Sequence, residues 1–66
     1  MYYVQVMKPG IGDEWHQVNA WRNQATAIGD AKQRWANRAT PASNLTAIRV
    51  VKGRSNLVVV FERITN

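Results

Sequence analysis

The chain has 66 residues, of which 45% are hydrophobic, and a formal net charge of +5 at pH 7. This length predicts one small domain, residues 1–66, near the lower limit for folding without covalent staples, and the lack of cysteine excludes disulfides and thiolate zinc sites. The composition is too hydrophobic for a disordered chain, and no apolar run approaches the roughly 18 residues of a membrane span. The first six residues do not read as a signal peptide. We therefore expect a small soluble cytoplasmic domain with no membrane partner.

Two strand-like segments come first in the chain. Residues 2–8 and 15–21 alternate between apolar and polar positions. Residues 9–13 between them contain a proline and two glycines, which is typical of a turn. The short connection predicts an antiparallel hairpin. Strict alternation along the second strand would place Trp15 and Trp21, six residues apart, on the same face.

A helix is expected next. Asn23 or Thr26 can cap its start, and a sequence rich in Ala, Gln, Arg and Lys continues to about Ala39. Pro41 disfavours helical geometry in the residue before it, so the helix should end there. At 100° per residue the apolar side chains form one stripe, made of Ile28, Ala31, Trp35 and Ala39. We expect Trp35 to be buried between this stripe and the sheet.

A second hairpin closes the chain, with strands at residues 45–52 and 57–64 joined by a turn at 53–56. The last strand is apolar on both faces, which is typical of a strand at the centre of a covered sheet. The element order is therefore ββαββ. We predict an α+β fold, a four-stranded antiparallel sheet with the helix packed on one face.

One helix covers only one face of such a sheet, and the other face would also carry apolar side chains. The candidates for that face are Tyr3, Met7, Leu57, Val59 and Phe61, with Trp15 and Trp21. A bare apolar face of that size is unusual in a monomer. Three explanations stay open: a homodimer, through this face or through strand edges; a platform for a ligand or partner; or coverage by strand twist and loops.

The charge is unevenly distributed. Residues 31–66 carry seven basic side chains and one acidic one, a net of +6, whereas residues 1–30 carry −1. A field of this kind attracts polyanions. The candidate nucleic-acid-binding residues are Arg49, Lys52, Arg54 and Arg63 on the second hairpin, where we expect Arg49 and Arg63 to approach each other across the ladder. The alternative is that these side chains provide solubility and cover apolar surface with their stems.

The helix and the aromatic residues allow two interpretations each. Arg34 and Arg38 follow Asp30 at intervals of four, which favours an ordinary solvated face stabilised by ion pairs. Aromatic side chains on a sheet can stack nucleic-acid bases, or they can form a core or an interface. The candidates for stacking or for an interface are Trp15, Trp21, Tyr3 and Phe61.

Catalytic chemistry has little support. His16 is the only histidine, and it has no cysteine, serine or second histidine at a useful spacing for a metal site or a triad. Asp13 and Glu14 are adjacent, so on a strand they would point to opposite faces. We expect no enzyme, no metal and no cofactor.

The overall pattern resembles small ββαββ open reading frames of phages and other mobile elements. The residues that carry the resemblance are Tyr2-x-Val4-x-Val6, Trp15-x-x-Val18, Trp35-Ala36, Ile48-Arg49-Val50-Val51 and Val58-Val59-Val60-Phe61. The resemblance implies a non-enzymatic accessory factor, which in a phage would act in the host cytoplasm. Two functions therefore stay open. One is binding of nucleic acid or another polyanion, and the other is binding of a host protein through the sheet face or an edge strand.

Overall fold

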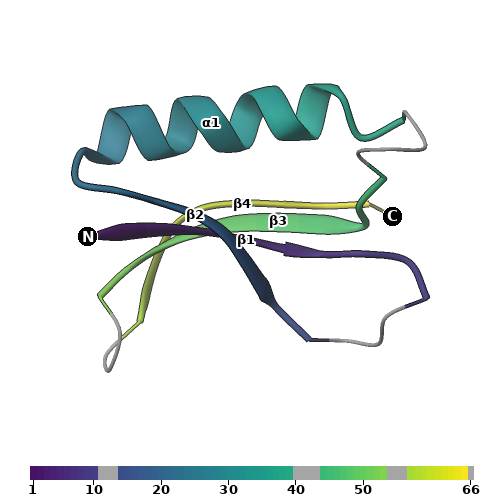
Figure 1. The fold of residues 1–66 in the computed structure, drawn as a ribbon, viewed down its shortest axis with the longest axis horizontal. Helices are drawn as coiled ribbons and strands as arrows, with labels where there is room; N and C mark the ends of the chain where they lie inside the picture. Colours follow the sequence, from purple (N-terminus) through teal and green to yellow (C-terminus); the bar gives the residue numbers. More distant parts are fainter. Residues whose placement is uncertain (11–13, 40–43, 54–56, 66) are drawn as a thin grey trace.

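A computed structural model describes residues 1–10, 14–39, 44–53 and 57–65 of the chain. In these ranges it contains four strands and one helix, with the bounds β1 (Tyr2–Met7), β2 (His16–Trp21), α1 (Gln24–Ala36), β3 (Ala47–Lys52) and β4 (Val58–Ile64). The strands form one antiparallel sheet, and α1 packs across one of its faces (Figure 1). The predicted ββαββ architecture and both hairpins are confirmed.

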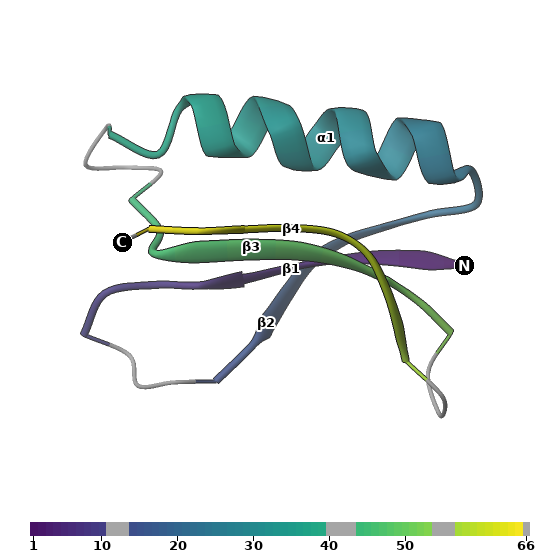
Figure 2. The ribbon, with the colours of Figure 1, turned by 180° about the vertical axis from the view of Figure 1, so that it is seen from behind.

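The order of the strands is β2-β1-β3-β4, so β1 and β3 are central and β4 is an edge strand. Figure 2 shows the molecule from the β4 side. The prediction that the last strand lies at the centre is wrong. After α1 the chain returns to the sheet beside β1, on the side away from β2. β3 takes this place, so β4 pairs with β3 alone and forms an edge. The doubly covered strand is β3, in which four of six residues are buried.

Each edge strand contains one extra residue in its ladder. Val4 pairs with Asn19 and Gln5 with Gln17, which leaves Val18 of β2 without a partner. In the same way, Val50 pairs with Phe61 and Val51 with Val59, which leaves Val60 of β4 without a partner. A bulge of this kind moves the following side chains to the other face of the sheet. Both bulges therefore change which residues share a face.

The main core lies between α1 and the sheet. Its largest fully buried side chains on this face are Val4, Val6, Ile48 and Val50. The helix contributes two alanines, Ala27 and Ala31, which are completely buried and let α1 lie close to the strands.

The predicted N-cap Asn23 is confirmed, since its side chain accepts a hydrogen bond from the backbone N–H of Thr26. The helix ends at Ala36, with Asn37 as the C-cap, so it is one turn shorter than predicted. The prediction that Trp35 is buried between the helix and the sheet is correct only in part. Its ring is partly buried and packs against the rim of the core, because the two alanines occupy the centre of the contact with the sheet.

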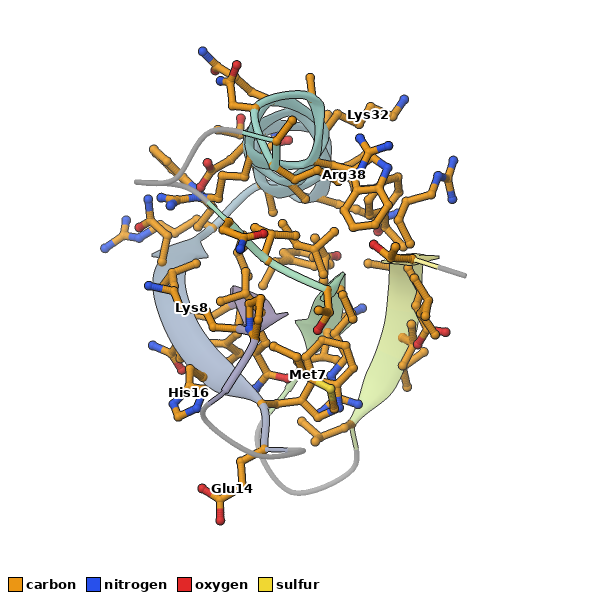
Figure 3. The ribbon with its side chains drawn as sticks, turned by 90° about the vertical axis from the view of Figure 1, so that its right-hand side faces the viewer. Met7, Lys8, Glu14, His16, Lys32 and Arg38 are labelled. Atoms are coloured by element: carbon orange, nitrogen blue, oxygen red, sulfur yellow. The ribbon has the colours of Figure 1, made fainter. Side chains whose placement is uncertain are left out.

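The face opposite α1 is covered at its centre by the chain itself. Tyr3, Ala47 and Val51 point to this face, and all three are buried. The beginnings of β2 and β4 both bend away from the helix, toward this side of the sheet (Figures 1 and 3). Twist therefore produces a second, smaller core under β1 and β3, which is one of the three explanations that the sequence left open.

The helix in the described ranges, α1, has 13 residues, and no helix there is long and apolar enough to cross a membrane.

Candidate binding surface

The predicted nucleic-acid-binding residues that the structure describes, Arg49, Lys52 and Arg63, do not form one patch. Arg49 lies opposite Glu62 in the β3–β4 ladder, whereas Arg63 lies opposite Ile48. Because Ile48 faces the helix and Arg49 faces the other way, the two arginines lie on opposite faces of the sheet. The prediction that they approach each other across the ladder is wrong. Arg54 lies outside the described residues.

Arg49 is held on the face opposite α1. Its Nε–H donates a 2.7 Å hydrogen bond to Gln5 Oε1, the residue directly across from it on β1. Its guanidinium carbon lies 4.2 Å from the centre of the Trp15 ring, a cation–π contact. Arg49 therefore helps to cover the second core, and the structure gives it a clear stabilising role.

Lys52 lies on the helix-facing side, at the end of β3 where Tyr2 and Val58 are its neighbours across the two ladders. Its ammonium is 5.9 Å from the centre of the Tyr2 ring, and the side chain is exposed. The contact is long enough to leave the ammonium free for other partners.

Arg63 belongs to a second group of cations, which sequence reasoning missed. Its guanidinium carbon lies 4.6 Å from the centre of the Phe61 ring. On the helix, Arg38 lies over Trp35 in the same way, at 4.2 Å. Trp35 and Phe61 both pack against the core under α1, so each of these two arginines is stacked on an aromatic ring at the edge of the same core.

Lys32 completes this group. At 100° per residue it lies on the same flank of α1 as Ile28 and Trp35. Figure 3 shows Lys32 and Arg38 on the side of the helix that overhangs β4. We call this surface the basic flank, defined by Lys32, Trp35, Arg38, Phe61 and Arg63.

The bulge at Val60 accounts for the composition of the basic flank. Without it, Phe61 and Arg63 would share a face with Val59, which pairs with Val51 on the side opposite the helix. With it, Phe61 pairs with Val50 on the helix side. Two sequence signals pointed to the flank: Arg38 follows Trp35 by three residues, which makes them neighbours on a helix, and Arg63 follows Phe61 by two, which puts them on one strand face.

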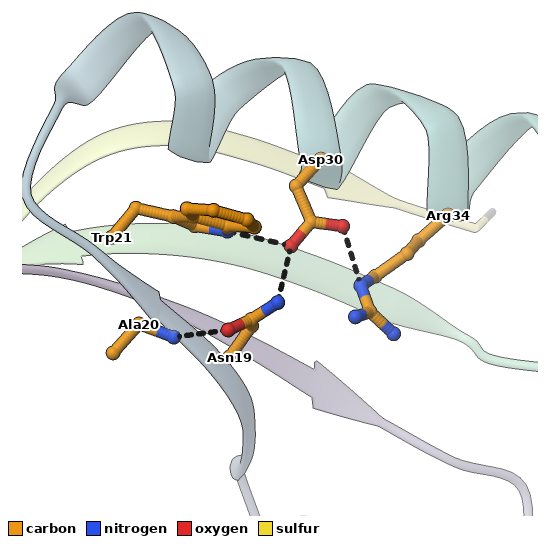
Figure 4. Close-up of polar contacts among 5 residues, drawn as sticks. All are labelled: Asn19, Ala20, Trp21, Asp30 and Arg34. Atoms are coloured by element: carbon orange, nitrogen blue, oxygen red, sulfur yellow. Dashed lines mark hydrogen bonds and ion pairs between the residues drawn. The ribbon is translucent and has the colours of Figure 1, made fainter.

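The other flank of α1 has an acidic centre (Figure 4). Asp30 Oδ2 accepts hydrogen bonds from the indole N–H of Trp21 (2.8 Å) and from the amide of Asn19 (3.2 Å), and Oδ1 accepts one from Arg34 Nε (2.8 Å). This carboxylate ties the helix to β2 and occupies Arg34. The predicted pairing of Asp30 with Arg34 is confirmed.

The aromatic candidates for stacking are dispersed. Trp21 faces the helix beside Tyr2, whereas Trp15 contacts Arg49 on the opposite face. The prediction that the two tryptophans share a face is wrong, because the bulge at Val18 reverses the alternation between them. Tyr3 is buried. Phe61 is therefore the candidate that joins a cationic surface.

In the described ranges, no three histidine or acidic side chains come together in a group that could hold a metal ion. His16 lies opposite Val6. Its Nε2 atom is buried without a hydrogen-bond partner.

The outer side of β4 is apolar and accessible. Val58 and Ile64 are each 56% exposed and Val59 is 47% exposed. These side chains begin and end the edge strand, and Glu62 and Arg63 lie between them.

Comparison of the chain with protein-family models, with curated proteins and with solved structures found no match.

Proposed function

We propose that this chain is a non-catalytic binding module that holds a polyanion, above all the phosphates of a nucleic acid, against the basic flank. The observation that carries the proposal is the pair of arginines stacked on aromatic rings, Arg38 on Trp35 and Arg63 on Phe61, with Lys32 beside them. In the part of the chain that the structure describes, the one ion pair joins Asp30 to Arg34. The cations of the flank are thus not neutralised by a neighbouring acid.

Stacking suits these arginines to phosphate binding. A ring beneath the guanidinium restricts its plane, so less side-chain entropy is lost when an anion binds at its edge. Arg38 and Arg63 each use one N–H to hold a backbone carbonyl, that of Trp35 and that of Glu62. The remaining donors are available for phosphate oxygens, which guanidinium binds in a planar, two-point geometry.

Binding of this kind is driven by counterion release, so it depends on salt and not on base sequence. Lys52 lies on the same helix-facing side and extends the cationic surface toward the other end of the hairpin. The formal charge of +5 adds long-range attraction to any polyanion. The predicted contribution of Arg49 and Arg54 stays a prediction.

Protein binding is the second candidate, and the exposed apolar edge of β4 favours it. The proposal includes self-association, which would double the basic flank in one particle. The resemblance to small accessory proteins of phages and mobile elements stays a prediction. It fits either candidate.

A salt titration tests the primary proposal. Binding of a fluorescently labelled DNA duplex and of a labelled single strand is measured by anisotropy at several salt concentrations. The parent is compared with the double variant Arg38→Gln/Arg63→Gln, which keeps most of the stems that cover the aromatic rings. The matched control is Lys8→Gln/Arg22→Gln, because both of these cations are exposed and neither belongs to the flank.

The slope of log affinity against log salt should become shallower by roughly two units in the flank variant, about 0.9 per lost phosphate contact. The control should change the slope by less than half as much. Equal losses in the two variants would show that the flank has no special role. A parent that binds neither DNA at low salt would refute the nucleic-acid function and leave protein binding as the better proposal.

A further inference from the structure

The outer edge of β4 differs from that of an ordinary edge strand. Edge strands carry unpaired N–H and C=O groups and are usually protected by lysine, proline, or inward-pointing charge. Residues 57–65 contain neither lysine nor proline, and the strand begins and ends with the exposed side chains Val58 and Ile64. The strand has the bulge at Val60 and two exposed charges near its end, Glu62 and Arg63, whereas residues 57–60 carry no charge.

The opposite edge of the sheet provides an internal comparison. β2 presents polar residues such as Gln17, which is exposed, and Asn19, whose amide is bonded to Asp30. It carries a bulge at Val18 as well. One edge of the sheet is therefore polar and the other is apolar.

Charge indicates what covers the apolar edge. Residues 57–65 contain one acid and one base, Glu62 and Arg63, so the strand has no net charge, and the two side chains lie on opposite faces of the sheet. The strand itself therefore adds no net repulsion when it lies beside an identical strand. A second copy of the chain carries the same neutral, apolar strand and is present at the same concentration.

We infer that β4 pairs antiparallel with β4 of a second copy, so that two four-stranded sheets become one continuous eight-stranded sheet. Val59 and Ile64 both lie on the face opposite α1, since they pair with Val51 and Ala47. The antiparallel arrangement can therefore place Val59 of each strand beside Ile64 of the other, so that exposed apolar side chains meet. This inference rests on the self-association included in the proposed function, and it identifies the surface that is used.

The geometry also limits the assembly to two chains. After pairing, both outer edges of the joined sheet are β2 strands, which are polar and bulged. Such edges do not accept another strand readily. A closed dimer is therefore expected, and not a growing fibre.

Pairing through β4 brings the two basic flanks together. A two-fold axis perpendicular to the sheet keeps both helices on the same face, and the Lys32 side of each helix overhangs β4 (Figure 3). The cations of the two copies would then face each other across the paired strands. A polyanion bound between them would relieve their repulsion, so polyanion binding and dimer formation should strengthen each other.

Sedimentation equilibrium over a range of protein concentrations tests this inference. The test variant is Val58→Lys, which adds a charge to the exposed end of β4, and the matched control is Gln17→Lys, which adds the same charge to the β2 edge. Val58→Lys should weaken dimerisation at least about tenfold, as expected for an interface residue. Gln17→Lys should change it less than about threefold, and raising the salt concentration should strengthen the parent dimer by screening its positive charge.

Amide hydrogen exchange gives a second readout that does not depend on a variant. Amides of β4 should exchange more slowly at high than at low protein concentration, and amides of β2 should not change. A parent that stays monomeric at millimolar concentration, or a dimer that protects β2 and leaves β4 unchanged, overturns the inference. So does a dimer that forms equally well with Val58→Lys.

The two proposals fail separately. The Val58→Lys chain keeps every residue of the basic flank, so as a monomer it should still bind the labelled duplex, with a lower affinity than the parent. A dimer through β4 that binds no DNA would refute the proposed nucleic-acid function and keep the inference. Salt-dependent DNA binding by a strict monomer would support the proposed nucleic-acid function and refute the dimer through β4.

Discussion

The Asp30 carboxylate is the strongest polar connection between the helix and the sheet, and replacing it has a calculable cost. Asp30→Ala removes the acceptor of three hydrogen bonds, from Trp21, Asn19 and Arg34. The Asp30 side chain is 16% exposed, whereas that of Arg34 is 37% exposed. The donors on β2 therefore lose a partly buried partner, while Arg34 can return to water.

The magnitude follows from these three contacts. The short bond from the Trp21 indole to a carboxylate contributes about 1.5 kcal/mol, and the longer one from Asn19 about 1 kcal/mol. The largely solvated pair with Arg34 contributes only about 0.5 kcal/mol, since water screens it. Because contacts to one carboxylate are not additive, we expect a total loss of about 2–3 kcal/mol. A domain of this length has about 3–10 kcal/mol of stability in all.

Urea unfolding followed by tryptophan fluorescence and far-UV circular dichroism measures this loss. Asp30→Asn should lie between the parent and Asp30→Ala, because it keeps a neutral acceptor in the same place. Glu14→Ala is the control, since this exposed acid lies away from the network, and it should change stability by less than about 0.5 kcal/mol. A loss of the same small size for Asp30→Ala would refute the idea that this carboxylate fastens α1 to β2.

Three further predictions concern stability and are measured by the same unfolding assay. Gly29→Ala should stabilise the protein by about 0.5–1 kcal/mol, because a Cβ added on the helix meets nothing within 4 Å. Gly10 has equal space but a φ of +79°, so Gly10→Ala should destabilise the protein by about 1 kcal/mol. Val51→Ala should cost about 2 kcal/mol, as much as Val50→Ala on the helix side, and a negligible loss would contradict the second core. Trp35→Ala should cost about 2 kcal/mol, less than the roughly 3–5 kcal/mol of a fully buried tryptophan, and a loss within that range would show that its ring is a central core residue.

The local features of the fold were predictable from the sequence. Alternating apolar residues located the strands, the candidate caps Asn23 and Thr26 located the start of the helix to within three residues, and the apolar stripe identified the face of α1 that meets the sheet. These signals are short-range, since each depends on residues within a few positions of one another. The strand order was not predictable, because it depends on whether β3 or β4 pairs with β1, and both strands are apolar enough to do so.

The candidate site was predicted less well, for a specific reason. The bulges at Val18 and Val60 leave no signal in composition, yet each reverses the alternation that assigns side chains to faces. Trp15 and Trp21 were thereby separated, and Arg63 was moved from the side of Arg49 to the side of the helix. The basic flank exists because of a one-residue irregularity in β4.

The location of the polyanion site is tested most directly by NMR. Titrating an isotopically labelled sample with a short DNA duplex and following the arginine side-chain and tryptophan indole resonances maps the contact residue by residue. We expect the largest shifts at Arg38, Arg63 and the Trp35 indole, with little change at Trp15 and Arg49. Shifts concentrated at Trp15 and Arg49, or no shifts at saturating DNA, would contradict it.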